Sequence, residues 1–416
     1  MESYLDSKLD KECFGCEACA QCCPKNAITM KENNEGFRYP EIDENKCIHC
    51  NLCRKVCPYT NMPQKYQEKQ YAWGGYHTDW KIRDLSTSGG AFSAIVDAFC
   101  DNNYIIFGVT SQGLKVFHTY VNDKNKVKIF RKSKYLQSNM GDSFIKVKEF
   151  LRVGKKVLFS GTPCQIAGLK SFLKNEKVDN LLTVEVICEG VPSPYFMKKY
   201  NQHLKKQYFS DIVEIDYRYT DTNEIFDKKY GKWDFQVMNV ELENGRKIKK
   251  DRWINPFWKI WLSHLMSRPA CYNCKFTTSD RVADITLGDL WGVHLYCPEL
   301  YGKNGGASLV ICNSEKGKKV FEIAKKQLYG HELDFETAKK YQSPLRKSIN
   351  ANPKREEFMA DLLNPDIDYK GLCKKWYEKP TLKLLLSKYI WGNRQKIWLL
   401  NLKNKNKNKC GGSSNE

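Results

Sequence analysis

Residues 13–24 read CFGCEACAQCCP, and residues 47–58 read CIHCNLCRKVCP. Both stretches fit the pattern C-x₂-C-x₂-C-x₃-C-P. The gaps of two residues let a tight loop bring three thiolates onto one face of a metal–sulfur cube, and the fourth cysteine ligates the neighbouring cube. The doubled pattern therefore predicts that residues 1–62 form a bacterial-type ferredoxin module with two [4Fe–4S] clusters.

The crossed arrangement of this pattern assigns four cysteines to each cluster. The first cluster is expected on Cys13, Cys16, Cys19 and Cys57. The second cluster is expected on Cys23, Cys47, Cys50 and Cys53. Cys22 breaks the spacing and is interpreted as a bystander. Zinc is the main alternative, but zinc sites use four ligands, usually as two separated pairs, and would leave several of these thiols idle.

The 18 cysteines would suggest a disulfide framework in a secreted chain. The chain begins MESYLDSKLDKE, which lacks the basic start and apolar core of a secretory signal. No run of about 18 apolar residues, the length that spans a bilayer, occurs in it. We therefore expect a cytoplasmic protein whose clustered thiols bind metal.

The formal net charge of +20 predicts a basic surface, even after bound clusters lower it by several units. An acidic electron carrier, nucleic acid, an anionic membrane or a phosphorylated substrate would each complement that charge. The chain lacks the aromatic-rich basic motifs of a known nucleic-acid reader. We expect a low-potential electron carrier or a partner redox enzyme, and no nucleic acid.

Strand and helix patterns alternate after a polar linker at residues 61–69. Alternation of this kind predicts an α/β domain with a mixed, largely parallel sheet behind the α+β ferredoxin fold. The expected strands are residues 104–109, 155–161, 181–188, 283–289 and 307–312. The expected helices include residues 91–100 and 165–173. Residues 346–416 are interpreted as a basic C-terminal extension with a disordered end.

Four cysteines behind the module stand out: Cys164, Cys188, Cys271 and Cys274. The first two lie at the ends of predicted strands, and the carboxyl ends of neighbouring parallel strands converge on one crevice. With the nearby C-x₂-C pair they could form a four-thiolate site. The alternative is that they are small buried apolar residues and a lone pair.

The loop 86–90, STSGG, precedes a predicted helix and could present backbone N–H groups to a phosphate. An ordinary N-cap with a glycine turn explains it equally well. No G-x-G-x-x-G motif occurs, so a standard dinucleotide site is not supported.

Five motifs in order carry a family resemblance: RDLSTSGGAFSAI, KYLQSNMG, FSGTPCQIAGLK, VICEGVPSP and CYNCKFTTSDRVADITLGDLWG. Over residues 70–345 the chain resembles the beta subunits of deazaflavin-reducing hydrogenases and formate dehydrogenases. The resemblance implies a flavin domain divided into residues 70–150 and 151–345, with FAD and a third [4Fe–4S] cluster on Cys164, Cys188, Cys271 and Cys274. It implies that FAD contacts Ser88, Gly89, Gly90, Lys134, Gln137, Gly161, Thr162 and Pro163.

The resemblance further implies an oxidoreductase that moves electrons between clusters, FAD and a small organic substrate, such as a deazaflavin. A non-catalytic subunit that relays electrons to a partner enzyme is the alternative. Catalytic residues are not assigned, although His77, His294 and Asp289 are candidate proton donors. Basic and aromatic residues are mixed at helical spacing at residues 375–400. Packed helices with a solvated basic face explain this pattern best, and an interfacial helix on a membrane or a surface that docks a partner are the alternatives.

Cys23→Ala and Cys22→Ala distinguish the ligand from its neighbour. Only Cys23 follows the third cysteine of its motif at the required gap of three residues. We therefore expect Cys23→Ala to lose one cluster, about four irons, and Cys22→Ala to keep both clusters. Iron content of anaerobically purified protein measures this, and equal loss in both variants would contradict the assignment.

Overall fold

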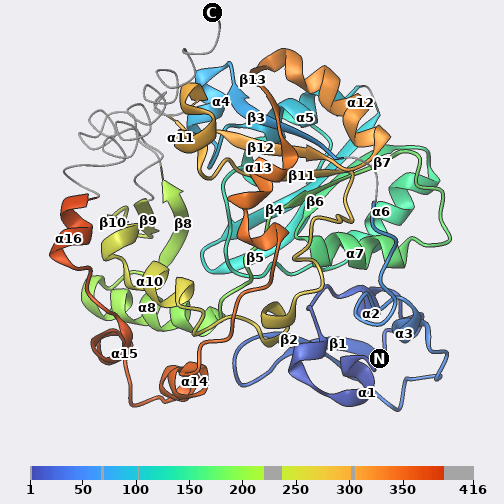
Figure 1. Cartoon of the computed structure of the whole chain (residues 1–416). Coiled ribbons are helices and arrows are strands. Elements are labelled where there is room, and N and C mark those ends of the chain that lie inside the picture. Colours follow the sequence, from blue (N-terminus) through green and yellow to red (C-terminus); the bar gives the residue numbers. More distant parts are fainter. Residues whose placement is uncertain (1, 67–69, 102, 220–236, 301–304, 388–416) are drawn as a thin grey trace, which may run out of the picture.

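An eight-stranded sheet of buried apolar strands forms the centre of this computed structural model (Figure 1), which describes residues 2–66, 70–101, 103–219, 237–300 and 305–387. The strand order is β13-β3-β12-β11-β7-β6-β4-β5. In chain order the strands are β3 (Tyr71–His77), β4 (Tyr104–Gln112), β5 (Lys115–Val121), β6 (Lys156–Gly161), β7 (Leu181–Val186), β11 (Ile285–Asp289), β12 (Ser308–Cys312) and β13 (Leu328–Leu333).

The four central strands, β4, β6, β7 and β11, run parallel to one another. The outer strands pair antiparallel: β5 with β4 on one side, and β12, β3 and β13 on the other. The mixed α/β sheet expected from the sequence is therefore confirmed. Its parallel part matters for the site, because the carboxyl ends of β6, β7 and β11 meet at one edge.

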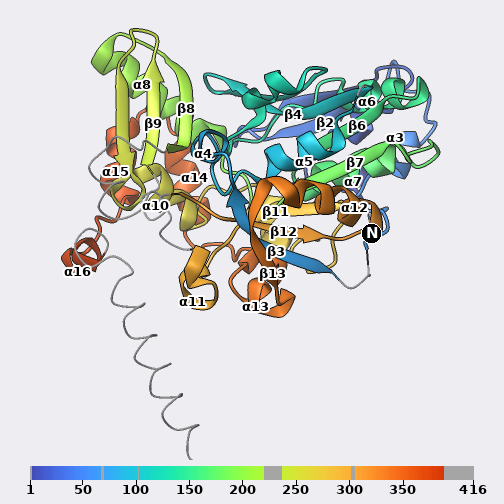
Figure 2. The ribbon, with the colours of Figure 1, turned by 90° about the horizontal axis from the view of Figure 1, so that it is seen from above.

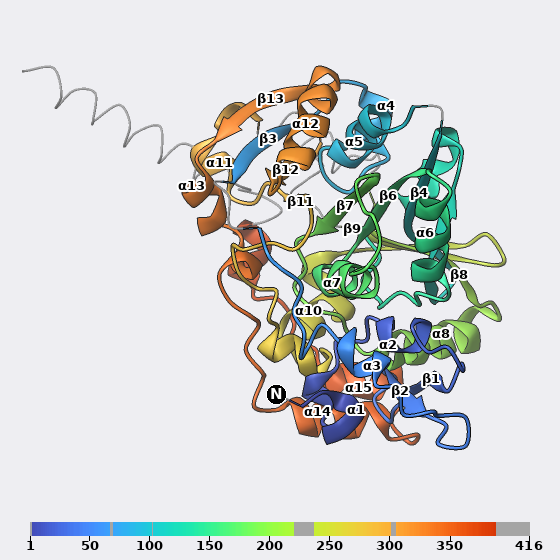
Figure 3. The ribbon, with the colours of Figure 1, turned by 90° about the vertical axis from the view of Figure 1, so that its right-hand side faces the viewer.

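Helices cover both faces of the sheet. On one face, α5 (Ala91–Phe99) and α12 (Glu315–Ala324) bury Ile95 and Phe321 against the strands. On the other face, α6 (Ser143–Arg152) and α7 (Pro163–Phe172) do the same with Phe144 and Leu169 (Figure 3). Helix α7 begins directly after β6, with proline at its first position, where a missing N–H costs nothing.

Residues 2–62 fold as a small module with a two-stranded antiparallel sheet, β1 (Ile28–Glu32) and β2 (Arg38–Ile42). Its two cysteine loops have matching geometry. In each, a residue in the left-handed region follows the second cysteine and starts a short helix: Glu17 before α2 (Ala18–Gln21) and Asn51 before α3 (Leu52–Lys55). This repeated geometry supports the internal repeat of the cysteine motif. Helix α1 (Tyr4–Ser7) precedes both loops.

A second lobe, not expected from the sequence, packs beside the large sheet (Figure 2). Its antiparallel sheet has the order β10-β9-β8. Phe196, Trp258 and Phe358 belong to its apolar core. The strands are β8 (Ile212–Tyr219), β9 (Val237–Leu242) and β10 (Lys247–Asp251), and the helices are α8 (Pro194–Tyr208), α10 (Pro256–Leu262), α14 (Arg355–Leu363) and α15 (Tyr369–Trp376).

Short helices complete the chain: α4 (Trp80–Asp84), α11 (Val293–Tyr296), α13 (Phe335–Lys340) and α16 (Leu382–Leu385). Within the described residues, no helix has the length and apolar character needed to cross a bilayer. The predicted C-terminal extension contributes α14 and α15 to the second lobe. Residues 388–416, which include the expected disordered end, lie outside the described part of the chain.

The ferredoxin module packs directly against α6 and α7, so the linker is not its only connection to the rest of the chain. Phe14 and Ala18 share one apolar core with Phe144. The Gln21 side chain accepts a hydrogen bond of 2.7 Å from the Phe144 N–H at the start of α6. Gly168 in α7 brings the helix so close that a Cβ there would lie 3.0 Å from the Cys16 Sγ. The module and the large sheet therefore form one packed unit.

Gly168→Val should loosen this docking, because its methyl groups would push α7 away from Cys16. We expect a loss of about 1–3 kcal/mol, as for other overpacked interfaces. Gly371→Val is the matched control, since a Cβ at Gly371 meets nothing nearer than 3.4 Å. Thermal unfolding of the anaerobic protein checks the difference. Equal melting temperatures in the two variants would show that the approach of α7 to Cys16 is not tight.

Candidate functional site

The structure groups the first predicted set of cysteines inside the docked module. Burial raises the pKa of Cys16 well above its usual value, and the nearby Cys57, Cys13 and Cys164 thiols raise it further. Burial likewise raises the pKa of Cys19 well above its usual value, and the neighbouring Cys16, Cys13 and Cys57 raise it further. Thiolates crowded in this way repel one another, so the group is suited to bind a cationic iron–sulfur core.

The second predicted set lies nearer the solvent. Cys50 is exposed, whereas Cys23, Cys47 and Cys53 are half-buried. Cys47 and Cys53 both lie within electrostatic reach of Arg54, and the Ala27 N–H donates to the Cys23 Sγ at 3.3 Å. This set is therefore the more accessible of the two in the module.

Cys22 lies beside the second set without matching its spacing. Burial, followed by the neighbouring Cys53, Cys23 and Cys50, raises the pKa of Cys22 to about 12. Its thiol donates a hydrogen bond of 3.3 Å to the carbonyl of Cys19. Burial also raises the pKa of the predicted ligands Cys16 and Cys19, so the bystander role of Cys22 stays a prediction from its spacing.

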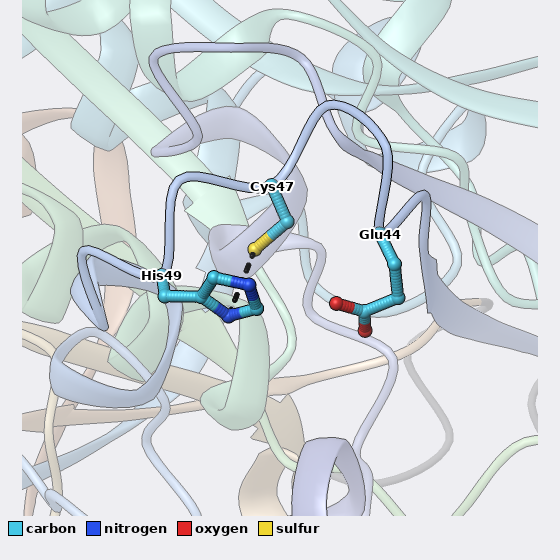
Figure 4. A group of neighbouring side chains, drawn as sticks. All are labelled: Glu44, Cys47 and His49. Carbon is cyan, nitrogen blue, oxygen red and sulfur yellow. Dashed lines mark hydrogen bonds between the residues drawn. The ribbon is translucent and has the colours of Figure 1, made fainter.

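Glu44 and His49 flank Cys47 on the second cysteine loop (Figure 4). The His49 Nδ1 lies 3.9 Å from the Cys47 Sγ, and the donor atoms of all three residues lie within 4.8 Å of one another. His49 has a positive φ of 50°, which turns its ring back toward the sulfur. With a cube on Cys47, the histidine and the carboxylate are its polar neighbours.

The third set, Cys164, Cys188, Cys271 and Cys274, also comes together. Cys164 lies in the first turn of α7, Cys188 follows β7, and the C-x₂-C pair lies at η5 (Pro269–Asn273). Burial raises the pKa of Cys188 well above normal, and Cys271, Cys164 and Cys274 add to it. Gly190 lets the chain turn closely past Cys271: a Cβ there would lie 3.2 Å from the Cys271 Cβ.

The separation of the sulfur atoms distinguishes a cube from a single ion. Tetrahedral zinc, with Zn–S bonds of about 2.3 Å, holds its sulfurs about 3.8 Å apart. Among the described residues, no three of these cysteines have their sulfurs within 4.8 Å of one another. The sulfurs of each set are thus farther apart than the ligands of one tetrahedral zinc ion.

Arg268 joins the first set to the third. Its guanidinium is 1% exposed and donates to the carbonyl of Cys13 at 2.8 Å, to the Gln137 Oε1 at 3.0 Å and to the carbonyl of Arg38 at 3.1 Å. Burial opposes its charge, but Cys13 and other neighbours, including Cys271 and Cys164, raise the pKa of Arg268. Sequence reasoning missed this residue, because nothing local marks it.

A cavity of about 600 Å³ opens at the carboxyl ends of β6, β7 and β11, between the large sheet and the second lobe. All four cysteines of the third set line it. The wall also contains several cationic side chains and two tryptophans at its second-lobe side: Arg131, Lys132, Lys134, Arg218, Arg252, Trp258 and Trp261. A pocket that is both basic and aromatic suits a planar ligand with phosphate groups.

Seven of the eight residues predicted to contact FAD line this cavity: Ser88, Gly90, Lys134, Gln137, Gly161, Thr162 and Pro163. Gly89 lies behind the wall. Its N–H donates to the Ser308 Oγ at 2.9 Å, and a Cβ there would lie 2.4 Å from the carbonyl oxygen of Gly75. Close packing on β3 therefore explains this glycine.

Lys134 and Gln137 have further partners. The Lys134 Nζ donates to the carbonyls of Ile129 and Arg131, at 3.2 and 2.6 Å. That leaves its third hydrogen for a ligand. Burial lowers the pKa of Lys134 to about 8. The Gln137 Nε2 donates to the carbonyl of Phe14 at 2.9 Å, so this residue also holds the ferredoxin module.

Of the candidate proton donors, Asp289 lies in the cavity wall and pairs with Arg218 of the second lobe. His77 is buried in β3, where its Nδ1 accepts from the Asp79 N–H at 3.0 Å. His77 and His294 are not among the residues that line the cavity. The residues contributed by the second lobe could not be predicted, since the lobe itself was not.

A family model described as "4Fe-4S dicluster domain" matches residues 12–61. A second model, which describes the C terminus of the beta subunit of coenzyme F420 hydrogenase/dehydrogenase, matches residues 154–337. A chain of the F420-reducing [NiFe] hydrogenase complex from Methanosarcina barkeri is similar at 16% identity with a TM-score of 0.40, over 75% of this chain and 92% of that one. No curated protein matches.

The molecule is an iron–sulfur protein of the oxidoreductase class, as its dicluster module and the second match define. Residues 154–337 match the model for the C terminus of the coenzyme F420 hydrogenase/dehydrogenase beta subunit. The resemblance inferred from the sequence is thereby confirmed.

Proposed function

We propose that the chain conducts electrons through three [4Fe–4S] clusters to FAD in the cavity, where a small organic substrate gains or gives up a hydride. The observation that carries this proposal is the alignment of three cysteine sets, from an exposed one to one that lines the cavity. The clusters would supply single electrons, and the flavin would convert them to pairs.

The order of the three cysteine sets supports a route for electrons from the surface of the module to the cavity. Cys50 of the second set is exposed and is the natural point of entry for a soluble donor. The first set lies between the second and the third: Cys164 of the third set acts electrostatically on Cys16 of the first. Helix α7, which carries Cys164, also holds Gly168 against Cys16. The same helix thus connects the module to the cavity.

The side chains of the cavity wall favour a flavin as the bound cofactor. Lys134 offers a donor to a phosphate, and the cationic residues Arg131 and Arg252 lie in the same wall. Trp258 and Trp261 offer aromatic surface on the opposite lobe. Together they favour an anionic, aromatic cofactor over a neutral or a cationic one.

Relay to a partner enzyme is the second candidate, favoured by the description of the matching family as a beta subunit. Low-potential donors should reduce the flavin in either case. Turnover of a small hydride acceptor by the isolated chain, at the rate at which the flavin is reduced, supports catalysis here. Flavin that is reduced and then reoxidised only when another enzyme is added supports the relay.

The charge of Lys134 should govern FAD binding. Its pKa of about 8 means that the free amine loses its positive charge as pH rises through that value, so FAD affinity should fall above it. Bound phosphate favours the charged form and moves the fall to somewhat higher pH. Lys134→Met should bind FAD on the order of tenfold more weakly at pH 7, the effect of about 1.5 kcal/mol from one charged hydrogen bond.

The pH profile is the decisive measurement, made by titrating flavin-free protein with FAD from pH 6.5 to 9.5. Lys134→Met should lack the fall that the parent shows. Lys132→Met is the control, because Lys132 lines the same wall but already pairs with Asp216. A parent-like fall in Lys134→Met would refute the role of this lysine.

Cys164→Ala tests the third cluster. Intact protein should contain about twelve irons, and the variant about eight, with the signals of the module unchanged. Flavin should remain bound and be reduced far more slowly by a low-potential donor, because the last cluster before the cavity is gone. Stopped-flow reduction measures this, with Cys100→Ala at the end of α5 as the control. Full iron and the parent rate in Cys164→Ala would show a plain buried thiol.

A further inference from the structure

Three side chains of types that ligate metals meet at β13, an edge strand of the large sheet. Cys297 follows α11, Glu299 lies in the short helix η6 (Pro298–Leu300), and His331 lies on β13. Their donor atoms all lie within 4.8 Å of one another. None of the three lines the cavity, and none belongs to a predicted cysteine set.

Both other groups approach the same nitrogen of His331. The Cys297 Sγ lies 3.3 Å from the His331 Nε2, and the Glu299 Oε1 lies 3.1 Å from it. A ring nitrogen offers either one hydrogen or one lone pair. The carboxylate needs the hydrogen, whereas a thiol donor needs the lone pair. A single hydrogen on Nε2 therefore serves the carboxylate and leaves the sulfur only as a weak second acceptor.

Glu299 and Cys297 thus compete for one ring nitrogen. The Glu299 carboxylate faces the same nitrogen, Nε2, that the thiol approaches. It therefore does not bind Nδ1 and leave Nε2 to the thiol. A cation satisfies all three groups at once, because each supplies it with a lone pair.

The distances match such a centre. Tetrahedral zinc with a Zn–S bond of about 2.3 Å and a Zn–N bond of about 2.0–2.1 Å separates sulfur and nitrogen by about 3.5 Å, and nitrogen and oxygen by about 3.3 Å. The separations of 3.3 and 3.1 Å agree closely with these values. Thiolate and imidazole together favour zinc over magnesium or calcium, which take oxygen ligands.

We propose that Cys297, Glu299 and His331 bind one Zn²⁺ ion, separate from the iron–sulfur centres. Glu299 and His331 are 49% and 45% exposed at their side chains, so the fourth position faces solvent and takes a water molecule. The ion links the edge strand β13 to the segment after α11. This inference does not depend on the proposed function.

The link would brace one rim of the cavity. Asp289 and Trp291, which line the cavity, lie just before α11, and Cys297 directly follows that helix. Tyr296, beside Cys297, stacks on Tyr341 of the wall with ring centres 5.2 Å apart. A zinc ion on Cys297, Glu299 and His331 would hold this segment against β13, and none of these three residues lines the cavity.

The test uses anaerobic, iron-loaded full-length protein, treated with a chelator that spares the clusters and then supplied with ZnSO₄. We expect about one zinc per chain by mass spectrometry. The zinc K-edge spectrum should show one sulfur at about 2.3 Å and three nitrogen or oxygen ligands. His331→Gln and Glu299→Gln should each weaken zinc binding about tenfold or more, with the iron content unchanged.

His203→Gln is the control, a histidine on α8 that stacks on Tyr369. Both test residues are half-exposed, so their variants should fold, and iron content reports any failure to do so. A zinc spectrum with four sulfurs would place the ion in a cysteine set and overturn the proposal. Absence of retained zinc would overturn it too, as would equal affinity in His331→Gln and His203→Gln.

Discussion

The guanidinium of Arg268 is the interaction on which the arrangement of the molecule depends. A buried charge is costly unless its donors are all engaged, and loss of one partner from a buried pair costs about 3–5 kcal/mol. Arg268 meets this demand from both sides of one interface: the carbonyls of Cys13 and Arg38 belong to the ferredoxin module, and Gln137 belongs to the domain of the large sheet. Displacing the module would therefore leave this buried charge without two of its acceptors.

That constraint fixes the first and third cysteine sets relative to each other. Arg268 immediately precedes η5, which carries Cys271, and its side chain reaches the loop that carries Cys13. The same positive charge faces thiols of both sets. It offsets the repulsion that clusters with anionic ligands would exert across the interface. The docking of the module and the electrostatics between the two cysteine sets thus share one side chain.

The parts that the sequence predicted are those with local signatures. The cysteine spacing of the module, the strands β4, β6, β7, β11 and β12, and the helices α5 and α7 each follow from periodicity or from a motif within a dozen residues. Seven of the eight residues expected around FAD lie together for the same reason: they come from short motifs.

The remainder depends on contacts between distant segments. Arg268 has no motif, and its importance comes from carbonyls more than 200 residues away. Gly89 occurs in a loop typical of phosphate binding, yet a glycine is required there because the backbone of β3 leaves no space for a Cβ. The second lobe combines segments on both sides of residues 269–345, so no continuous stretch of sequence reveals its core.

The second lobe meets the cavity through charge pairs. Arg218 on β8 pairs with Asp289 at the end of β11, and Asp216 on β8 pairs with Lys132 from the other wall. Both pairs have one partner on each lobe, whereas the cysteine sets and Arg268 lie outside the second lobe. Changes on β8 can therefore alter the shape and charge of the cavity at the second lobe while the cysteine sets and the contacts of Arg268 stay in place.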